Sequence, residues 1–391
     1  MQKEMNAAAL CAVGAEKAVS NEIRKIGLKV EESGFGRVRF RADTAGLYRA
    51  LMGLRAADRV LLEIGCFPAE DFDALFEETH SLPWEEIIPA GMGLKVAKVR
   101  TNRSKLKAEV SIQAVVHKAA AARLCEKHSQ KRLPEWGDQA ELRVYIEKDK
   151  ASILLDLSGE PLFKRGYRGE GRGGIAPLRE TTAAAIILLS GWKRKFPLYD
   201  PFCGSGTIAV EAALYAWDIA PGLGRGFVLE KLLIADKKTE KKIRDELYAK
   251  IDFTRHICIS GSDADNRAVQ NAQTNLERAL KPFAGKKPAC MPEFHTLPME
   301  DIPPQAGLHA AADSLGFIIT NPPYGKRLED QAAAEKNYAG MGGLARQFEG
   351  WKLVLITDHP GFESFFGRKA VSCREITNGA ILSYLFQYDK L

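Results

Sequence analysis

Short apolar runs alternate with amphipathic segments along the whole chain, and the way they alternate changes near residue 157. Before that point, runs with strand character occupy residues 29–30, 36–40, 59–64, 94–99, 141–148 and 151–156, and helical periodicity occupies residues 15–26, 45–54, 72–78 and 107–127. This order predicts mixed α and β structure in the first part of the chain.

In the second part, buried strands are expected to alternate with helices. Apolar runs occupy residues 196–199, 256–263, 294–297, 317–320 and 351–357, and helical segments at 208–214 and 266–280 follow the first two. Two further runs, 369–375 and 380–388, flank Asn378-Gly379, a strong hairpin signal. The pattern predicts an α/β fold, with a parallel sheet that ends in an antiparallel hairpin.

The most specific chemistry in the sequence follows the run 317–320, in the motif Asn321, Pro322, Pro323 and Tyr324. A ligand crevice opens at the carboxyl ends of parallel strands. The amide oxygen of Asn321 and the carbonyl of Pro322 can both accept hydrogen bonds from one exocyclic amine, and a base can stack on Tyr324. The motif predicts a site that holds a nucleobase amine, although alone it could also be a proline-rich turn.

A second motif, DPFCGSGT at residues 200–207, lies between the run 196–199 and the helical segment 208–214. Glycines allow a ligand to approach the backbone closely, and the first N–H groups of a helix have no partner within it. The motif lacks the Gly-Lys-Ser/Thr of a P-loop and the glycine spacing of dinucleotide-binding folds. We predict a cofactor-binding turn with Asp200, Phe202, Gly204 and Gly206 as contacts.

Acids near the ends of the next two runs extend this pattern. Asp263 ends the run 256–263, where an acid accepts hydrogen bonds from ribose hydroxyls, and Asp265 suits the start of the following helix. Asp301 follows the run 294–297 and could accept from an adenine amine. With Asn321 after the fourth strand, these residues predict an enzyme that uses S-adenosylmethionine and has the seven-stranded, Rossmann-like sheet of class I methyltransferases.

Composition indicates a cytoplasmic protein. The chain has 391 residues, 46% of them hydrophobic, which is enough for more than one core. Its first residues are charged, and no apolar run reaches the length needed to cross a bilayer. Seven cysteines without a C-x-x-C pair are expected to be reduced thiols, and His and Cys do not cluster as metal ligands do. We therefore expect neither a membrane span nor a metal.

Basic residues concentrate in two places, although the net charge is only +6. Residues 98–107 contain five basic side chains and no acid, and a second group lies at residues 164–172. Phosphate contact is the natural use of such groups, and a solvated surface is the alternative. The predicted RNA contacts are Arg100, Arg103, Lys105, Lys164, Arg165, Tyr167 and Arg168.

Residues 158–177 contain six glycines among basic residues, which predicts a flexible connector that touches RNA. We therefore divide the chain into four segments: residues 1–54, residues 55–157, the connector 158–177, and a catalytic domain at residues 178–391.

Six short blocks give the whole chain a resemblance to a known family. They are LDLSG at 155–159, KRGYR at 164–168, APLRET at 176–181, DPFCGSGT at 200–207, IAPGL at 219–223 and NPPYG at 321–325. The chain resembles the bacterial THUMP-containing 23S rRNA guanine-N2 methyltransferases of the RlmL group, in their shorter, single-methyltransferase form.

This resemblance implies a ferredoxin-like segment at residues 1–54 and a THUMP domain, a fold associated with RNA binding, at residues 55–157. It also implies S-adenosylmethionine as methyl donor and guanine N2 of 23S rRNA as acceptor, with Asn321, Pro322 and Tyr324 at the catalytic site. Lys326 departs from the acid expected after the last block.

Other functions stay open on the residues alone. The same reaction could act on guanine N2 in tRNA, or on an adenine or cytosine amine in DNA, although the resemblance to RNA-binding proteins disfavours DNA. A non-catalytic RNA-binding or ribosome-assembly factor is an alternative of another class. The intact Asp200, Gly204, Gly206, Asp263 and Asn321 argue against it. The sequence does not indicate an oligomeric state.

Overall fold

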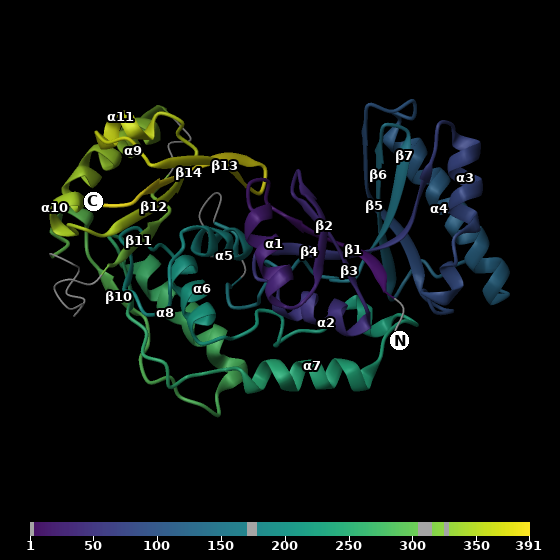
Figure 1. The fold of residues 1–391 in the computed structure, drawn as a ribbon, viewed down its shortest axis with the longest axis horizontal. Coiled ribbons are helices and arrows are strands. Elements are labelled where there is room, and N and C mark those ends of the chain that lie inside the picture. Colours follow the sequence, from purple (N-terminus) through teal and green to yellow (C-terminus); the bar gives the residue numbers. More distant parts are fainter. Residues whose placement is uncertain (1–3, 170–177, 304–314, 324–327) are drawn as a thin grey trace.

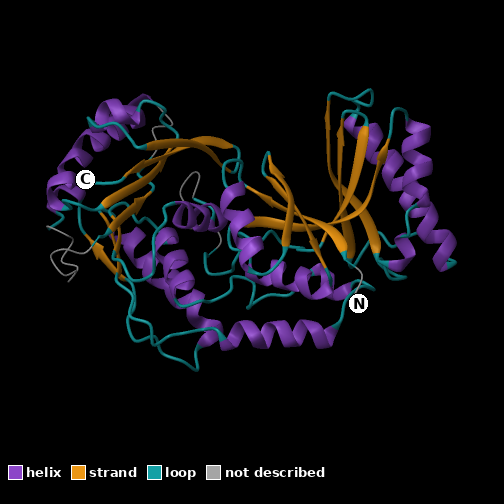
Figure 2. Ribbon diagram, in the orientation of Figure 1, coloured by secondary structure: helices purple, strands orange, loops and turns teal. Residues whose placement is uncertain are grey.

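A computed structural model describes residues 4–169, 178–303, 315–323 and 328–391 of the protein. These residues form two seven-stranded sheets, one in each half of the chain, with helices packed against them (Figure 1). Figure 2 shows the two sheets side by side, with helices between and around them. No helix within the described residues is both long and apolar enough to cross a membrane.

The first sheet has the order β2-β3-β1-β4-β7-β6-β5, and only the β5–β6 pair is parallel. Its strands are β1 (Met5–Cys11), β2 (Lys29–Gly34), β3 (Arg37–Ala42), β4 (Ala57–Pro68), β5 (Gly93–Asn102), β6 (Gln139–Glu147) and β7 (Lys150–Asp156). Because β4 pairs with both β1 and β7, this sheet is continuous across residues 54 and 55, where we divided the chain.

The helices of this half are α1 (Glu16–Lys25), α2 (Thr44–Gly53), α3 (Phe72–Ser81) and α4 (Glu109–His128). Asp43 and Asp71 cap α2 and α3, each accepting a hydrogen bond from a backbone N–H in the first turn. In β6, buried and partly exposed residues alternate, as expected of a strand with one face on the core.

The second sheet has the order β10-β9-β8-β11-β12-β14-β13. Its strands are β8 (Leu198–Asp200), β9 (Ile259–Asp263), β10 (Glu293–Thr296), β11 (Phe317–Thr320), β12 (Lys352–Thr357), β13 (Ser372–Asn378) and β14 (Ile381–Tyr388). β14 is antiparallel to both neighbours, and the other pairs are parallel. The predicted seven-stranded sheet, parallel with an antiparallel hairpin at its end, is confirmed.

The chain runs outward from β8 through β9 to β10 and then returns to β11 on the other side of β8. Such a switch point opens a crevice at the carboxyl ends of the strands.

The helices of this half are α5 (Glu180–Leu189), α6 (Thr207–Ala216), α7 (Lys237–Ala249), α8 (Asn266–Leu280), α9 (Leu328–Gly340), α10 (Leu344–Gln347) and α11 (Phe362–Phe366). Short 3-10 helices in the described residues are η1 (Trp84–Glu86), η2 (Val228–Lys231), η3 (Lys281–Phe283), η4 (Met299–Asp301) and η6 (Met341–Gly343).

Residues 158–169, the described part of the predicted connector, pack against both halves of the chain. The side chain of Arg165 is 3% exposed, and its Nε lies 2.9 Å from Oε1 of Glu211, which is fully buried on α6. Arg165 also donates to the carbonyl of Arg55 at 2.6 Å, and the hydroxyl of the buried Tyr167 donates to Glu211 at 3.0 Å. The prediction that Arg165 and Tyr167 contact RNA is therefore wrong, because both side chains are enclosed and engaged.

The two other basic residues of this group differ from each other. Arg168 donates to the carbonyl of Leu178 at 2.7 Å, and its side chain is only 17% exposed. Lys164 is 60% exposed and forms a surface ion pair with Glu160. Of the residues predicted to contact RNA in this group, Lys164 is the one whose side chain lies mostly in solvent.

Replacing Arg165 by Ala should destabilise the protein by about 3–5 kcal/mol, because it leaves the buried carboxylate of Glu211 without its counter-ion. Lys164→Ala, one residue away in an exposed ion pair, is the matched control and should cost no more than about 1 kcal/mol. Chemical denaturation of both variants measures the difference. Equal unfolding midpoints for the two variants would contradict this role of Arg165.

Candidate active site

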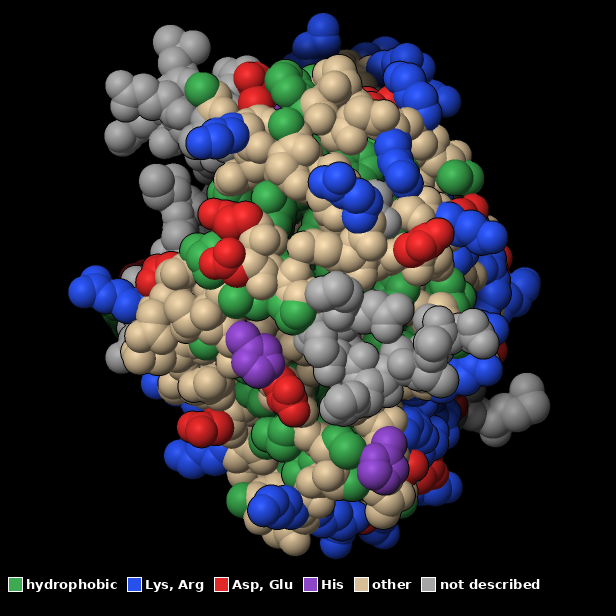
Figure 3. All heavy atoms as spheres, turned by 90° about the vertical axis from the view of Figure 1, so that its left-hand side faces the viewer, with side chains coloured by type: hydrophobic (Ala, Val, Ile, Leu, Met, Phe, Trp, Pro, Cys, Tyr) green, Lys and Arg blue, Asp and Glu red, His purple; other side chains and the backbone are tan. Residues whose placement is uncertain are grey.

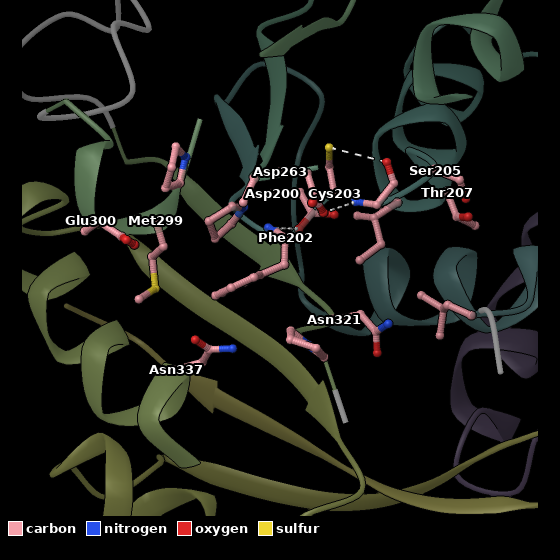
Figure 4. Close-up of a pocket in the computed structure, with 17 residues that line it drawn as sticks. Asp200, Phe202, Cys203, Ser205, Thr207, Asp263, Met299, Glu300, Asn321 and Asn337 are labelled. Atoms are coloured by element: carbon pink, nitrogen blue, oxygen red, sulfur yellow. Dashed lines mark hydrogen bonds between the residues drawn. The ribbon is translucent and has the colours of Figure 1, made fainter. Parts of the chain in front are cut away.

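A cavity of about 540 Å³ lies at the carboxyl ends of β8, β9 and β11 (Figure 4). Its size falls in the range typical of small-molecule sites. The labelled residues that line it come from several segments: Asp200, Phe202, Cys203, Ser205, Thr207, Asp263, Met299, Glu300, Asn321 and Asn337. The structure therefore brings the two predicted motifs, which are more than one hundred residues apart in sequence, into one site.

The turn after β8 joins this site through Gly204 and Asp263. Gly204 has a φ of +52°, and a Cβ built on it would meet nothing within 4 Å, so this stretch of backbone borders open space. Its N–H donates to Oδ2 of Asp263 at 2.9 Å, and Oδ1 of Asp263 accepts from the N–H of Asp265 at 3.0 Å. These bonds tie the end of β9 to the glycine turn. As predicted, Asp265 caps the following helix, α8.

Gly206 does not line the cavity, contrary to our prediction. Its φ is +77°, and a Cβ there would lie 2.8 Å from Cβ of Ala272 and 3.2 Å from Cε1 of Phe294. Glycine is required at this position because α6 packs closely against α8 and β10, and because a side chain would be strained at this φ.

Asp200 is the buried acid of the site, with 1% of its surface exposed. The hydroxyl of Thr320 donates to Oδ1 of Asp200 at 2.6 Å, and the N–H of Phe202 donates to the same oxygen at 3.2 Å. Burial, together with the charge of Asp263, raises the pKa of Asp200 to about 7 against the lowering effect of these two bonds. Its protonation state therefore changes near neutral pH.

Glu300, rather than the predicted Asp301, is the acid that lines the cavity from η4. Both acids are exposed, but Asp301 does not line the cavity, and its backbone N–H donates to the carbonyl of Pro298 at 3.1 Å. Successive residues of a 3-10 helix point about 120° apart, so a shift of one position decides which acid faces the site. The sequence indicated an acidic turn but not its orientation.

The Asn-Pro-Pro motif places Asn321 and Pro323 on the cavity wall, whereas Pro322 is buried and does not line it. The contact of a ligand with the Pro322 carbonyl stays a prediction. The hydroxyl of Tyr338 donates to the carbonyl of Pro323 at 3.4 Å, which joins the motif to α9. Tyr324 and Lys326 lie outside the described residues.

Asn337 of α9 also lines the cavity, and sequence reasoning missed it. In Figure 4 its amide lies beside Met299, across the cavity from the glycine turn. No motif marks Asn337, because its segment has the composition of an ordinary helix.

Cys203 lines the cavity as a neutral thiol. Burial, together with Asp200 and Asp263, raises the pKa of this thiol far above its usual range. A thiolate is needed for nucleophilic attack, so the site does not favour a covalent mechanism through Cys203. The described residues contain no group of three or more His, Cys, Asp or Glu side chains arranged to hold a metal ion.

The predicted RNA contacts Arg100, Arg103 and Lys105 lie on the first sheet, at and beyond the end of β5, and all three are exposed. Arg100 pairs with Glu109 at 2.9 Å, and Lys105 pairs with Glu70. Exposed pairs of this kind are worth about 1 kcal/mol or less. They leave the basic side chains available to a polyanion.

Known proteins are similar to this chain over nearly its whole length. The chain is 34% identical over 388 residues to YpsC of Bacillus subtilis strain 168, a candidate RNA methyltransferase, covering 99% of this chain and 96% of YpsC. It is 33% identical over 389 residues to the ribosomal RNA large subunit methyltransferase K/L of Syntrophotalea carbinolica, covering 96% of this chain and 52% of that protein. The crystal structure of SMU.472, a candidate methyltransferase complexed with SAH, matches 100% of this chain and 99% of its own, with a TM-score of 0.86 and 34% identity.

Family models match both halves of the chain. The RlmL ferredoxin-like domain matches residues 6–61, which carry α1, α2 and the first strands of the first sheet. The RMKL-like methyltransferase domain matches residues 165–385, which contain the second sheet and the residues that line the cavity. The chain therefore belongs to the family of RMKL-like methyltransferases that carry an RlmL ferredoxin-like domain.

Proposed function

We propose that this protein transfers a methyl group from S-adenosylmethionine to the exocyclic N2 amine of a guanine in 23S rRNA. The observation that carries this proposal is the position of Asn321 at the carboxyl end of β11, on the wall of the cavity that also holds Asp200 and Asp263. An amide that can hold a nucleobase amine thus borders the same space as the acids of a nucleotide-like cofactor site.

The residues of the cavity fit S-adenosylmethionine. Asp263, at the end of the second strand, offers carboxylate oxygens to ribose hydroxyls, and the open backbone at Gly204 allows close approach of the methionine portion. Asp200 provides a buried carboxylate beside which a cationic group is favoured. The SAH in the crystal structure of SMU.472 supports the same choice of cofactor.

S-adenosylmethionine supplies a methyl group that its sulfonium already activates. The task of the protein is then to align the acceptor amine and to exclude water. The amide oxygen of Asn321 would accept a hydrogen bond from the guanine amine, which orients its nitrogen toward the methyl group and stabilises the positive charge that develops on it. No strong base is required, because the methylated nitrogen is cationic and acidic, and it can lose its proton to solvent after the transfer.

Ribosomal RNA is the proposed acceptor because the relative from Syntrophotalea carbinolica is named for the large ribosomal subunit. The exposed basic residues of the first sheet support a nucleic-acid substrate, with residues 55–157 proposed as the THUMP domain. Figure 3 shows the end of the molecule formed by the second sheet, where Lys and Arg side chains gather toward the margins. We place the enzyme in the cytoplasm, where its substrate is assembled.

Binding of S-adenosylmethionine should tighten about tenfold between pH 6 and pH 8. Below the pKa of about 7, Asp200 is protonated and offers no charge to the cofactor, whereas above it the carboxylate favours the sulfonium cation. Calorimetric titration across this range measures the effect. Asp200→Asn should bind weakly and without this pH dependence, so the same pH profile in the variant would remove Asp200 from cofactor binding.

Glu300→Gln should weaken S-adenosylmethionine binding by about 1–2 kcal/mol, because it removes a charged acceptor from the cavity wall. Asp301→Asn, at the neighbouring exposed position, is the matched control and should leave the affinity unchanged. The two titrations decide which acid belongs to the site. A loss confined to Asp301→Asn would restore the assignment made from sequence.

Asn321→Ala should lower the rate of methyl transfer on the order of 10² to 10³-fold, because it removes a preorganised acceptor from the reacting amine. RNA binding should hardly change, since phosphate contacts dominate affinity. Asn321→Asp keeps an acceptor and should retain more activity than the Ala variant. Single-turnover assays with a 23S rRNA transcript measure these rates.

Mass mapping of the product identifies the methylated position, with tRNA and DNA as competing acceptors. A methyl group on N2 of a guanine in the rRNA supports the proposal. Full activity of Asn321→Ala, or a methyl group on another atom or nucleic acid, would contradict it.

A further inference from the structure

A second cavity, of about 470 Å³, lies where the two halves of the chain meet. Among the residues that line it are Lys17 and Lys25 of α1, Arg374 of β13 and Tyr215 near the end of α6. We call this cavity the seam groove.

We propose that the seam groove binds the phosphate backbone of the RNA substrate, as a contact separate from the cofactor cavity and from the basic residues around β5. This proposal rests on the proposed function in one respect, namely that the substrate is RNA.

The charge of the seam groove is positive and is not cancelled by its own surroundings. Lys17, Lys25 and Arg374 do not take part in any ion pair recorded between described residues, and all three are exposed. The one acid that lines the groove, Glu22, accepts hydrogen bonds from the backbone N–H groups of Arg55 and Ala56, both at 3.0 Å. Its carboxylate is thus directed into the protein, and three cations remain to face the groove.

The architecture holds two of these cations, Arg374 and Lys25, at defined positions. The guanidinium of Arg374 donates to the carbonyl of Gly14 at 3.4 Å, and the ammonium of Lys25 lies 5.8 Å from the centre of the Tyr215 ring. The loop before α1 is bound to β13 through Val13 and Thr377, with the N–H of each residue donating to the other. Arg374 and Lys25 therefore stand on elements that are packed together, α1, α6 and β13.

The groove and the cofactor cavity lie at opposite ends of the same two helices. Leu178, just before α5, and Thr207, the first residue of α6, line the cofactor cavity. Leu189, the last residue of α5, and Tyr215 of α6 line the seam groove. Each helix has ten residues and is therefore about 15 Å long. A single RNA segment can span this distance, so a backbone held in the groove and a base held in the cavity are compatible.

An exposed aromatic ring in the turn that is hydrogen-bonded to the first turn of α1, which carries Lys17, favours RNA over a free anion. Phe35, in the turn between β2 and β3, is 98% exposed and has a φ of +49°. A bulky residue such as Phe35 is strained in that conformation, and because its ring is exposed, burial does not offset the strain. The next residue, Gly36, donates its N–H to Glu16 at 2.7 Å, and Glu16 precedes Lys17 in α1. Exposed aromatic rings beside basic residues are the platforms on which unpaired bases stack.

The test compares two triple variants of the full-length protein on a 23S rRNA transcript. Lys17→Gln/Lys25→Gln/Arg374→Gln removes the cations of the seam groove. Lys238→Gln/Lys241→Gln/Lys242→Gln removes three exposed cations from α7, which Figure 1 shows along the opposite edge of the molecule from β13. The affinity is measured over a range of salt concentrations.

For the groove variant, we expect the slope of log affinity against log salt to fall in magnitude by about 2, because each phosphate contact contributes about 0.7 to 0.9. Its affinity at low salt should fall at least tenfold, and Phe35→Ala should lower it about tenfold. S-adenosylhomocysteine affinity and thermal stability should match the wild type in all variants, which shows that they are folded. The α7 variant should keep most of the wild-type slope.

An unchanged slope in the groove variant, or an equal loss in the α7 variant, would overturn the proposal. A second outcome would also overturn it: inorganic phosphate binds the wild type but not the groove variant, while both proteins bind RNA with equal affinity. The groove would then be a site for a free anion. This outcome is separate from that of the proposed function, since salt-dependent binding needs no methyl transfer. A methyl group mapped to a different position with a reduced slope in the groove variant would refute the substrate assignment and leave the seam groove supported.

Discussion

The buried ion pair between Arg165 and Glu211 connects the two halves of this protein, and the geometry of both depends on it. Removing two charges from water is expensive unless each finds partners in the interior. Here Glu211 forms an ion pair with Arg165 and accepts a hydrogen bond from the hydroxyl of Tyr167, and Arg165 donates to the carbonyl of Arg55. Because Glu211 lies on α6, which begins at the cofactor turn, the pair ties the first sheet to the helix that shapes the catalytic cavity.

Backbone hydrogen bonds across the interface make the two halves one packed unit rather than domains joined by a hinge. The N–H of Gly222 donates to Met52 at 2.9 Å, and the N–H of Leu229 donates to Leu157 at 3.2 Å. Gly14 approaches β13 so closely that a Cβ would lie 2.1 Å from the carbonyl oxygen of Glu375. The exposed basic residues of the first half therefore hold their position relative to the cavity on the second.

The cavity itself shows a local conflict between stability and function. Asp200 is buried beside a second acid, Asp263, in surroundings that raise its pKa. An apolar residue at this position would avoid the free-energy cost of burying a carboxylate. Natural proteins retain such unfavourable groups chiefly at functional sites. The hydrogen bonds from Thr320 and Phe202 offset part of the penalty and hold the carboxylate in one orientation.

Much of the second half could be predicted from sequence, because its signals are local. The helix at residues 266–280 and the strand at 317–320 have the predicted bounds, and the turn around Gly379 joins β13 to β14. The positions of Asp200, Asp263 and Asn321 at predicted strand ends were sufficient to predict that they lie together, because the carboxyl ends of parallel strands meet at one edge of a sheet. By contrast, β1 was missed: its sequence, MNAAALC, is rich in alanine, and its pairing with β3 and β4 makes it a strand.

The sequence by itself indicated the strands of the second sheet, their order along the chain and the residue types at the strand ends, because periodicity, turn residues and motif spacing act over a few neighbouring positions. It did not indicate the helices α5, α7 and α9. Only the tertiary structure decided which charges are exposed and which are buried. Arg165 and Tyr167 read as surface groups in a glycine-rich segment, yet Glu211, 44 residues beyond Tyr167, encloses them. The choice of Glu300 over Asp301 likewise depends on how η4 is oriented toward the cavity. The need for glycine at position 206 depends on how closely the start of α6 packs against α8. Orientation and long-range pairing are properties of the packed interior, and no local pattern encodes them.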